Sequence, residues 1–357
     1  MLILDYCNLS FKMILEEIEK KIRVQEEKIG KFNLLLIGAV SFIVIFSISQ
    51  FLQEKIIEFG LKNNLKKYSL NESVFVDQNS STLEQKGTPR EPFREISRAL
   101  IHQEKNPEIK NIYINPGKYQ GNFQIPENVN LYANKPGTMI IENSLDEKTL
   151  ELKGNNIISG LEIQGGEYGI YIGSEAKNIK IENCKITQAS SYGIYNKEHP
   201  ETNDEYKLEI INSEVNKNYN HGLYLQKGTL IMKNSKIYEN SLNGIDLHIN
   251  MKVVITDSEI FDNVKSGIEA DLGNLDLTIK NSTLRNNNLN GINLQSDFEN
   301  SILKIENNLF ENNRNAGINC IKKSTITPLY FSNSFETNPL ENNQFQDNNT
   351  NVGPNCL

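Results

Sequence analysis

Hydrophobic and polar residues alternate in short runs through the second half of the chain, and many of these runs begin with a glycine followed by a large aliphatic residue. Alternation with a period of two predicts β-strands that bury one face. Examples are GLYLQ at 222–226 and GIDLH at 244–248. The glycine recurs at intervals of 22 to 29 residues, at Gly169, Gly193, Gly222, Gly244, Gly267, Gly291 and Gly317.

A second alternating run follows in every unit, from NIKIENCKI at 178–186 to ILKIENNLF at 302–310. Each run carries an asparagine or aspartate at an equivalent place, where these residues tolerate a left-handed backbone and bond to their own chain. We therefore expect a bend at each position and, with the units stacked, an internal asparagine ladder. The six positions are Asn183, Asn212, Asn234, Asp257, Asn281 and Asn307.

No repeat unit contains a periodic segment of helix length. Two or three short strands per unit of roughly 23 residues predict a parallel β-solenoid, in which each coil adds a strand spacing of ~4.8 Å. A leucine-rich repeat is the alternative because it uses leucine and asparagine at a similar period. Its consensus L-x-x-L-x-L-x-x-N is not met, and the six-residue period of left-handed hexapeptide solenoids is absent.

Units of the form N-x-G-I-x-L … I-x-N-S-x-I resemble the right-handed parallel β-helix repeats of the pectate-lyase-like superfamily, over about residues 155–348. Upstream, residues 87–134 resemble the N-terminal cap of uncharacterised bacterial β-helix proteins. The resemblance implies an all-β, single-stranded right-handed parallel β-helix with an N-terminal helical cap. The matching pieces of the cap are Pro92-Phe93, Ile96, Ala99-Leu100, Pro116-Gly117-x-Tyr119 and Pro126-x-x-Val129.

The two ends of a solenoid need separate treatment, because an open end exposes core residues and unpaired strand edges. We expect a helix around residues 93–103 to cover the first end with Phe93, Ile96, Leu100 and Ile101. At the other end the repeat decays after residue 348. Cys320 and Cys356 could form a disulfide in an oxidising compartment, but Cys320 takes an inward strand position, which favours a buried thiol.

Residues 32–52 form an apolar run without a charge over 21 positions, long enough to cross the ~30 Å hydrocarbon core of a bilayer as a helix. A buried soluble helix and a cleaved signal peptide are the alternatives. Thirty-one residues precede the run and no clear A-x-A site follows it, so we predict an uncleaved signal anchor. Six Lys and Arg residues in 12–31 against four in 53–72 predict a cytoplasmic N-terminus and an extracytoplasmic β-helix.

The segment before the span has apolar residues at heptad-like spacing, at Leu15, Ile18, Ile22 and Ile29. Self-association as a short coiled coil, a helix on the membrane surface, and a plain helical extension of the span all fit. The expected organisation is a cytoplasmic helical segment (1–31), the span (32–52), a linker (53–72), the cap and first coils (73–135), the β-helix (136–348) and a tail (349–357).

Composition narrows the function only by exclusion. The chain has 357 residues, 38% of them hydrophobic and 23% charged, which excludes a disordered tail protein and a multi-span membrane protein. The net charge of −8 argues against a nucleic-acid partner, which requires a basic face. Four cysteines without a C-x-x-C pair indicate neither a zinc site nor a disulfide framework.

Candidate chemistry lies on the face that follows each Gly-Ile pair, because a solenoid aligns equivalent outward residues into columns. Stacked carboxylates at Asp246, Glu269 and Asp271 would raise one pKa or bind a bridging calcium ion, and His248 could act as a general base or ligand. Outward tyrosines could stack on sugar rings, although a merely solvated face also carries polar residues. One column is Tyr171, Tyr195, Tyr224, Asp246, Glu269, Asn293 and Asn319; the other is Gly173, Lys197, Gln226, His248, Asp271, Gln295 and Ile321.

The run Gly244-Ile245-Asp246-Leu247-His248 resembles the Gly-Phe-Asp-Pro-His motif of mannuronan C5-epimerases, which are also right-handed β-helices. The resemblance implies that Asp246 or Asp271 neutralises a uronate carboxylate and that His248 abstracts the C5 proton. The family has a tyrosine before the glycine where this chain has Asn243, so Tyr224 would be the proton donor. Leucine also replaces the proline of the motif.

Three functions follow from these patterns. The first is a membrane-anchored extracytoplasmic β-helix that binds cell-envelope or extracellular polysaccharide along one face. The second is a uronate lyase or C5-epimerase-like enzyme that uses Asp246, His248, Asp271 and Tyr224, although an acidic face attracts a polyanion poorly without a bridging cation such as calcium. The third is a non-catalytic structural or protein-binding scaffold. The expected saccharide-binding residues are Tyr171, Tyr195, Lys197, Gln226, Glu269, Asn293 and Gln295.

Overall fold

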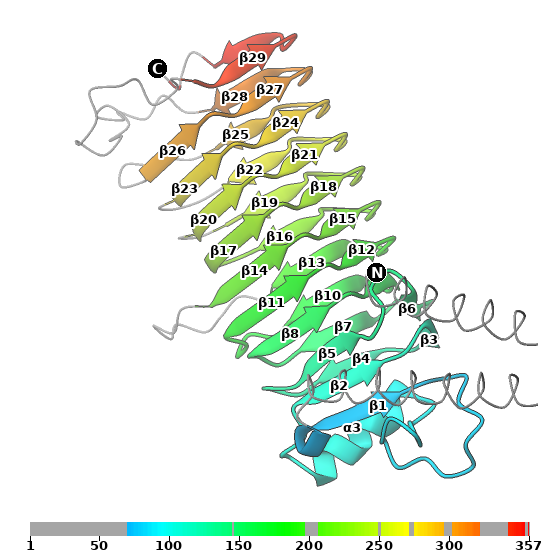
Figure 1. Ribbon diagram of the computed structural model, residues 1–357. Helices are drawn as coiled ribbons and strands as arrows, with labels where there is room; N and C mark the ends of the chain where they lie inside the picture. Colours follow the sequence, from blue (N-terminus) through cyan, green and yellow to red (C-terminus); the bar gives the residue numbers. More distant parts are fainter. Residues whose placement is uncertain are drawn as a thin grey trace, which may run out of the picture. The chain divides into compact units, whose positions relative to one another are not determined.

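The computed structural model describes residues 70–144, 146–196, 206–248, 251–270, 275–295, 302–321 and 342–353, together with Cys356. Within these residues, three parallel β-sheets of ten strands each surround one core (Figure 1). Between β2 and β28, successive neighbours in a sheet are three strands apart in sequence, as in β2–β5–β8, so the chain visits each sheet once per coil. The predicted all-β, right-handed parallel β-solenoid is confirmed.

We name the sheets A, B and C in the order in which the chain enters them. Sheet A contains β1 (Ser73–Val76), β2 (Asn111–Ile114), β5 (Asn130–Ala133), β8 (Asn156–Ser159), β11 (Asn178–Glu182), β14 (Lys207–Ile211), β17 (Gly228–Lys233), β20 (Met251–Thr256), β23 (Leu275–Lys280) and β26 (Ile302–Glu306). Sheet B contains β3 (Gly117–Gln120), β6 (Met139–Asn143), β9 (Glu162–Gly165), β12 (Lys185–Thr187), β15 (Glu214–Asn216), β18 (Lys236–Tyr238), β21 (Glu259–Phe261), β24 (Thr283–Arg285), β27 (Leu309–Glu311) and β29 (Gln344–Gln346).

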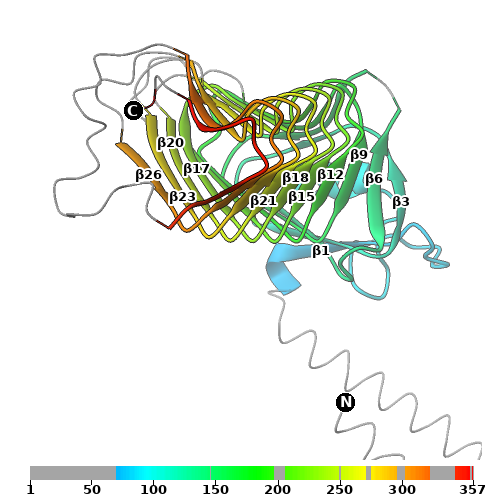
Figure 2. The same cartoon turned by 90° about the horizontal axis from the view of Figure 1, so that it is seen from above.

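Sheet C carries the Gly-Ile repeat. Its strands are β4 (Phe123–Ile125), β7 (Lys148–Leu152), β10 (Tyr168–Ile172), β13 (Tyr192–Asn196), β16 (Leu223–Leu225), β19 (Ile245–Leu247), β22 (Ile268–Ala270), β25 (Ile292–Leu294), β28 (Ala316–Cys320) and β30 (Thr350–Val352). Figure 2 shows the coils stacked behind one another, so that equivalent positions of successive coils form rows. A Cβ atom on Gly244 would lie 2.7 Å from the backbone oxygen of Gly267, so the next coil approaches too closely for any side chain there.

The bends between sheets A and B are confirmed at all six predicted positions, where φ lies between 47° and 57°. The sequence did not reveal a second left-handed residue in each coil, after the strand of sheet B. This second set has φ between 52° and 60° and includes residues with no special preference for that region. Its members are Gln188, Lys217, Glu239, Asp262, Asn286, Asn312 and Asp347.

An internal asparagine ladder exists, but it is not formed by the row of residues predicted for it. Some bend residues do bond to the neighbouring coil, as Asn234 does to Asn212, but the row is exposed, because a left-handed residue at the outer corner directs its side chain away from the core. The buried ladder lies six residues later, at the turn between sheets B and C, where each side-chain amide donates to the next oxygen over 2.9–3.1 Å. Its members are Asn218, Asn240, Asn263, Asn287, Asn313 and Asn348.

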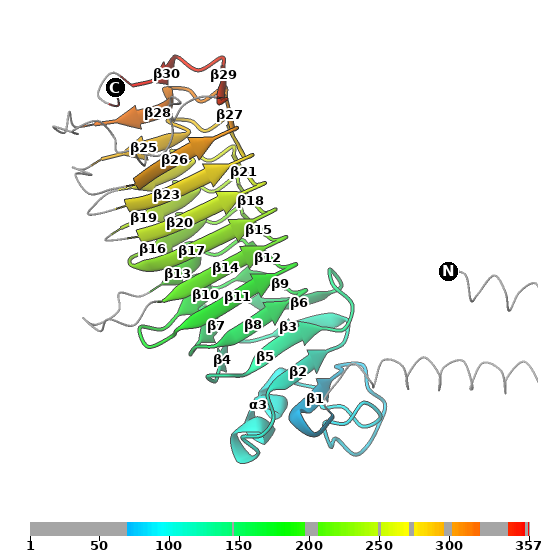
Figure 3. The ribbon, with the colours of Figure 1, turned by 60° about the vertical axis from the view of Figure 1, so that its left-hand side comes forward.

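The first end of the solenoid is covered by the α-helix α3 (Ile96–Lys105), preceded by the short 3₁₀-helix η1 (Leu70–Glu72) (Figure 3). Phe93, Ile96 and Ala99 are buried against the core and Leu100 packs beside them, so the predicted cap is confirmed. Ile101 is 53% exposed, and its predicted place in the cap is wrong. One residue is 100° of helix, which turns Ile101 away from the face that Leu100 borders.

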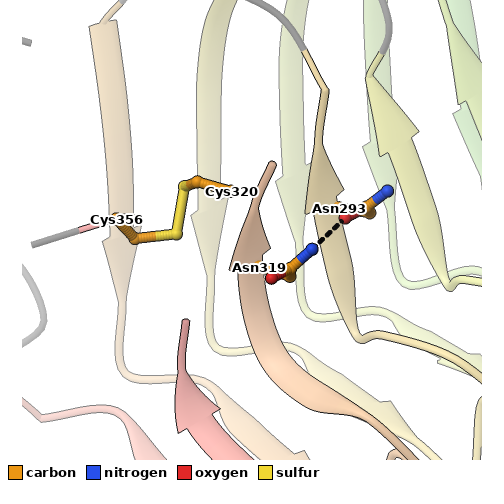
Figure 4. Close-up of a disulfide and its surroundings, with 4 residues drawn as sticks. All are labelled: Asn293, Asn319, Cys320 and Cys356. Atoms are coloured by element: carbon orange, nitrogen blue, oxygen red, sulfur yellow. Dashed lines mark hydrogen bonds between the residues drawn. A yellow bond between two sulfur atoms is a disulfide. The ribbon is translucent and has the colours of Figure 1, made fainter. Parts of the chain in front are cut away.

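At the other end, the tail returns to the last coils and pairs Cys356 with Cys320 in a disulfide (Figure 4). The Cα atoms of the two cysteines are 5.2 Å apart. The inward position of Cys320 in β28 is as predicted, but the prediction of a thiol is wrong, because the strand pattern carried no sign of where the tail would lie. The structure describes Cys184 as a free and buried cysteine.

The predicted N-terminal helix, the apolar run 32–52 and the linker up to residue 69 lie outside the described residues. From Leu70 onward, the described helices are too short and too polar to span a bilayer. The predicted span therefore stays a prediction.

Candidate functional site

The outward face of sheet C holds a row of residues that changes character along the solenoid. The strand register from β10 to β28 aligns the predicted first column, so its members follow one another coil by coil. The row begins with aromatic side chains, continues with carboxylates and ends with amides. It reads Tyr171, Tyr195, Tyr224, Asp246, Glu269, Asn293 and Asn319.

A second aromatic row, which the sequence analysis missed, lies directly beside the first. Its residues stand immediately before the repeat glycines, and that position was the available signal. Neighbouring tyrosine rings of the two rows have centroids 5.0 to 5.9 Å apart, within the range of favourable aromatic pairs. We call the five tyrosines the aromatic plate: Tyr168, Tyr171, Tyr192, Tyr195 and Tyr224.

The last tyrosine of each row contacts a histidine. His221 follows Tyr192 with 5.7 Å between ring centroids, and His248 lies 4.6 Å from Tyr224. At the opposite end, the ammonium of Lys148 sits 3.9 Å from the centre of the Tyr171 ring. Five half-buried tyrosines therefore form a continuous surface between a lysine and two histidines.

Asp246 lies between the two histidines. Its carboxylate oxygens are 3.2 Å from Nδ1 of His221 and 2.9 Å from Nε2 of His248, and each contact becomes an ion pair when that imidazole is protonated. The side-chain amide of Asn243 also donates to Asp246 over 2.9 Å. Asp246 is only 8% exposed, so this carboxylate is placed by the fold and directed at two proton-accepting groups.

Burial sets the protonation of the neighbouring groups. Burial lowers the pKa of His221, with smaller contributions from Lys265 and His248, and the charge of Asp246 opposes this shift. Burial raises the pKa of Glu269, while hydrogen bonds from Gln295 and Asn293 act in the opposite direction. Burial also raises the pKa of Tyr192 and Tyr195. These shifts favour the uncharged phenols of Tyr192 and Tyr195 and the neutral imidazole of His221.

The predicted second column is described only in part. Gln226, His248 and Gln295 border the first row, and Gln295 donates to Glu269. Lys197 and Asp271 lie outside the described residues, so their predicted contacts stay predictions. Asp246 and Glu269 are partners on neighbouring strands, as expected. The described segments hold no group of three His, Cys, Asp or Glu residues arranged to hold a metal ion, and calcium binding stays a prediction.

A groove of about 570 Å³ adjoins the plate at its N-terminal end. Four carboxylates and one ammonium lie along it, and two of its residues, Lys148 and Glu151, also border Tyr171. The sequence analysis did not reach this groove, because its side chains come from β4, β7 and the turns before β4, β7 and β10, which precede the first Gly-Ile pair. The lining residues are Asn122, Phe123, Gln124, Asp146, Glu147, Lys148, Glu151 and Glu167.

Known proteins resemble this chain at the level of fold. The family model described as "Right handed beta helix region" matches residues 201–355. A search of curated protein sequences gave no match. The predicted recognition as a right-handed parallel β-helix repeat protein is confirmed, and the solved structures with this fold include a pectate lyase.

Three solved structures represent the likeness. Pectate lyase Pel9A is 18% identical with a TM-score of 0.53, covering 70% of this chain and 74% of its own. A rhamnogalacturonan lyase is 17% identical with a TM-score of 0.51, covering 70% and 75%. The A-module of Azotobacter vinelandii mannuronan C-5 epimerase AlgE4 is 13% identical with a TM-score of 0.42, covering 71% and 90%. At these identities only the fold is shared, and the third likeness is too loose to bear on activity.

Proposed function

We propose that the protein binds polysaccharide along the outward face of sheet C. The aromatic plate is the observation that supports this function. It offers half-buried rings with phenolic hydroxyls, bordered by carboxylate and amide side chains such as Asp246, Glu269 and Asn293. Saccharides present apolar C–H faces together with many hydroxyls, and an aromatic surface edged by hydrogen-bonding groups suits both.

The direction of the face also suits a chain-like ligand. The groove, the plate and the Asp246 region follow one another in this order along the solenoid axis, and they do not converge on a closed pocket. The pectate lyase and the rhamnogalacturonan lyase named above are polysaccharide lyases on the same fold, which makes a carbohydrate ligand consistent with the architecture. An extended saccharide lying along sheet C is therefore the expected complex.

A glycan array tests this function with the full chain in mild detergent. The wild-type protein is compared with Tyr195→Leu at the centre of the plate and with Tyr132→Leu. Tyr132 belongs to another tyrosine stack, on sheet A, where its ring centroid lies 5.2 Å from that of Tyr113. Both variants lose one ring from a tyrosine stack, so Tyr132→Leu controls for the loss of a stacked ring outside sheet C.

We expect wild type and Tyr132→Leu to retain the same glycan signals, and Tyr195→Leu to lose at least about 90% of them, a tenfold change in affinity. Retained binding in Tyr195→Leu would remove the plate from the binding site. A folded protein that binds no glycan would contradict the proposed function.

A second candidate function is proton transfer on a bound uronate, as in lyases and epimerases. The pair of imidazoles on Asp246 favours it, because a neutral histidine next to a carboxylate is a suitable general base. His248 would take the C5 proton, and the resulting carbanion would either expel the C4 substituent or be reprotonated on the opposite face by Tyr224. The carboxylates on the face weaken this candidate, since they repel a polyanion.

Turnover assays with polymannuronate and polygalacturonate test the second candidate. Elimination is followed by ultraviolet absorbance of the unsaturated product, and epimerisation by proton NMR. We expect any turnover to disappear in His248→Ala and to persist in His102→Ala, which changes a histidine of the cap helix α3. The absence of turnover in wild type with both polymers would refute this candidate and leave the binding function intact.

The extracytoplasmic location with a single membrane anchor is also part of the proposal. Two features support it: the apolar run 32–52 and the Cys320–Cys356 disulfide, which persists in oxidising compartments. In intact cells, an impermeant thiol reagent added after reduction should label these cysteines, and membrane extraction should require detergent. Recovery of the chain in the soluble fraction with reduced cysteines would contradict this location.

A further inference from the structure

Carboxylates flank the aromatic plate at both ends. On one side, the groove carries Asp146, Glu147, Glu151 and Glu167 against the single ammonium of Lys148. On the other side, Asp246 and Glu269 follow the last tyrosine in the same row. The uncharged rings thus lie between two negative regions.

The negative charge is only partly neutralised within the protein. Lys148 and Lys153 both pair with Glu151, at 3.2 and 2.7 Å. Among the described residues, Asp246 contacts histidines and an asparagine, and Glu269 contacts the amides of Asn293 and Gln295. Neither carboxylate forms an ion pair with a lysine or arginine in that part of the chain. A ligand lying across the plate therefore meets negative potential at both ends.

This charge pattern discriminates among classes of saccharide. A uronate polymer would place its own carboxylates against Asp246 and the groove. Repulsion between these like charges would lower the affinity for a uronate polymer several-fold or more. A neutral polymer would satisfy the hydroxyl contacts and leave the carboxylates without a counter-charge. A polymer with ammonium groups on its sugars would use both the rings and the carboxylates.

We propose that the saccharide bound on sheet C is an amino-sugar polymer with free amines, held through its ammonium groups by Asp246 and by the acidic groove, with its rings on the plate. This inference rests on the proposed polysaccharide binding and names the class of ligand. The strands that hold Glu151 and Glu269, β7 and β22, are five strand spacings apart. That is roughly 24 Å, so several sugar units are needed to reach both ends.

Calorimetric titrations of the full chain in mild detergent test the ligand class. The probes are the β-1,4-linked glucosamine hexamer, the N-acetylglucosamine hexamer, the galacturonate hexamer and a lysine hexapeptide. The first two share one backbone and differ in the acetyl group that removes the charge. We expect the glucosamine hexamer to bind at least about tenfold more tightly than its acetylated form, and the galacturonate hexamer to bind most weakly.

Two variants assign the preference to residues. In the double variant Asp246→Asn, Glu269→Gln, the preference for glucosamine over N-acetylglucosamine should fall to about twofold or less, while N-acetylglucosamine affinity changes little. The matched control is Glu259→Gln, on β21 of sheet B in the coil that contains Glu269, where Glu259 pairs with Lys236 and Arg285. It should keep the wild-type preference. Tyr195→Leu should weaken both hexamers.

The outcomes separate the inference from the function on which it rests. Equal or tighter binding of N-acetylglucosamine or galacturonate would overturn the amino-sugar assignment and leave polysaccharide binding standing. Binding of the lysine hexapeptide as tight as that of the glucosamine hexamer, unchanged in Tyr195→Leu, would also overturn it, because charge alone would then explain the affinity. Failure of all saccharides to bind here and on the array would reject both proposals.

Discussion

The asparagine ladder and the aromatic plate are both rows of stacked side chains along the same axis, and they differ in what repeats. The ladder has asparagine in every coil from Asn218 to Asn348; its members from Asn218 to Asn313 are at most 1% exposed, and each of their amides is bonded to the next coil. The row through the plate changes from tyrosine to carboxylate to amide, and its tyrosines are half-buried rather than enclosed.

This difference shows how to recognise function in a repeat protein. A residue that recurs in every coil solves a problem that every coil has, here the buried backbone and amide groups of a turn. A residue that departs from its row solves a local problem. Asp246 follows the last tyrosine of its row and brings a carboxylate between two histidines, which the solenoid itself does not need.

The largest effect should come from the ladder. Asn263→Ala removes the acceptor of two hydrogen bonds from Asn240 and the donor to Asn287, and leaves those buried groups unsatisfied. We expect the free energy of unfolding to fall by about 3–5 kcal/mol, measured by urea denaturation. Asn288 is exposed and follows the ladder residue Asn287 in sequence. Asn288→Ala should keep a free energy of unfolding within about 0.5 kcal/mol of wild type. Equal effects of the two changes would deny the ladder its structural role.

A substitution in the plate should separate stability from binding. Tyr195 has ring contacts with Tyr168, Tyr171, Tyr192 and Tyr224, so Tyr195→Leu should lower the free energy of unfolding by about 1–3 kcal/mol while abolishing saccharide binding. Denaturation and calorimetry on the same preparation measure both quantities. A variant that is destabilised and still binds like wild type would make the plate a structural feature like the ladder.

Removing the charge of Asp246 should leave the coil intact and change the pKa of His221. The pKa of His221 is lowered by burial and held up by Asp246, so Asp246→Asn should lower it further. A lowered pKa means that the unfolded chain binds the proton more readily, so stability is full above the ordinary value of 6.5 and falls as the pH drops through the folded pKa. NMR titration of the imidazole should show the shift. The variant should also lose more free energy of unfolding than wild type does when the pH is lowered. An unchanged His221 titration would disprove the coupling.

The smallest effect should come from Glu269, whose contribution to stability changes with pH in the opposite direction to that of His221. Burial raises the pKa of this carboxyl, so the folded chain keeps the proton longer, and stability falls as the pH rises from the ordinary value of 4.5 through the folded pKa. Glu269→Gln should therefore gain stability relative to wild type at neutral pH and lose that gain in acid. Denaturation curves at the two pH extremes give the difference; a gain that is independent of pH would point to packing instead.

The sequence predicted most of the scaffold, because positions that repeat in every coil can be recognised by their regular spacing. The Gly-Ile pairs located sheet C, and Asn183 with its equivalents located the left-handed bends. The ladder was assigned to the wrong row, since alternation fixes which strand residues face inward but does not tell which turn residue points into the core. The disulfide was missed for a related reason: the fold of the tail beyond the last repeat depends on contacts that no periodicity records.

The site was predicted in part. The alignment of Tyr224, Asp246 and Glu269 follows from counting residues after each glycine. His221 and the second aromatic row were missed, because the position before the glycine was treated as the edge of the strand, whereas its side chains stack beside the first row. The acidic groove is lined by residues of β4, β7 and the turns before β4, β7 and β10, in coils that precede the Gly-Ile pairs on which the sequence spacing was counted.

Hydroxyl-radical footprinting of the full chain tests the central claim most directly, because the molecule contains its own control tyrosines. Oxidation of each tyrosine is followed by mass spectrometry with and without saturating glucosamine hexamer, and in parallel with the N-acetylglucosamine hexamer. We predict protection of Tyr168, Tyr192, Tyr195 and Tyr224, with unchanged oxidation of Tyr113 and Tyr132 on sheet A and of Tyr238 on sheet B. Protection confined to the control tyrosines, or none with either hexamer, would contradict the assignment of saccharide binding to sheet C.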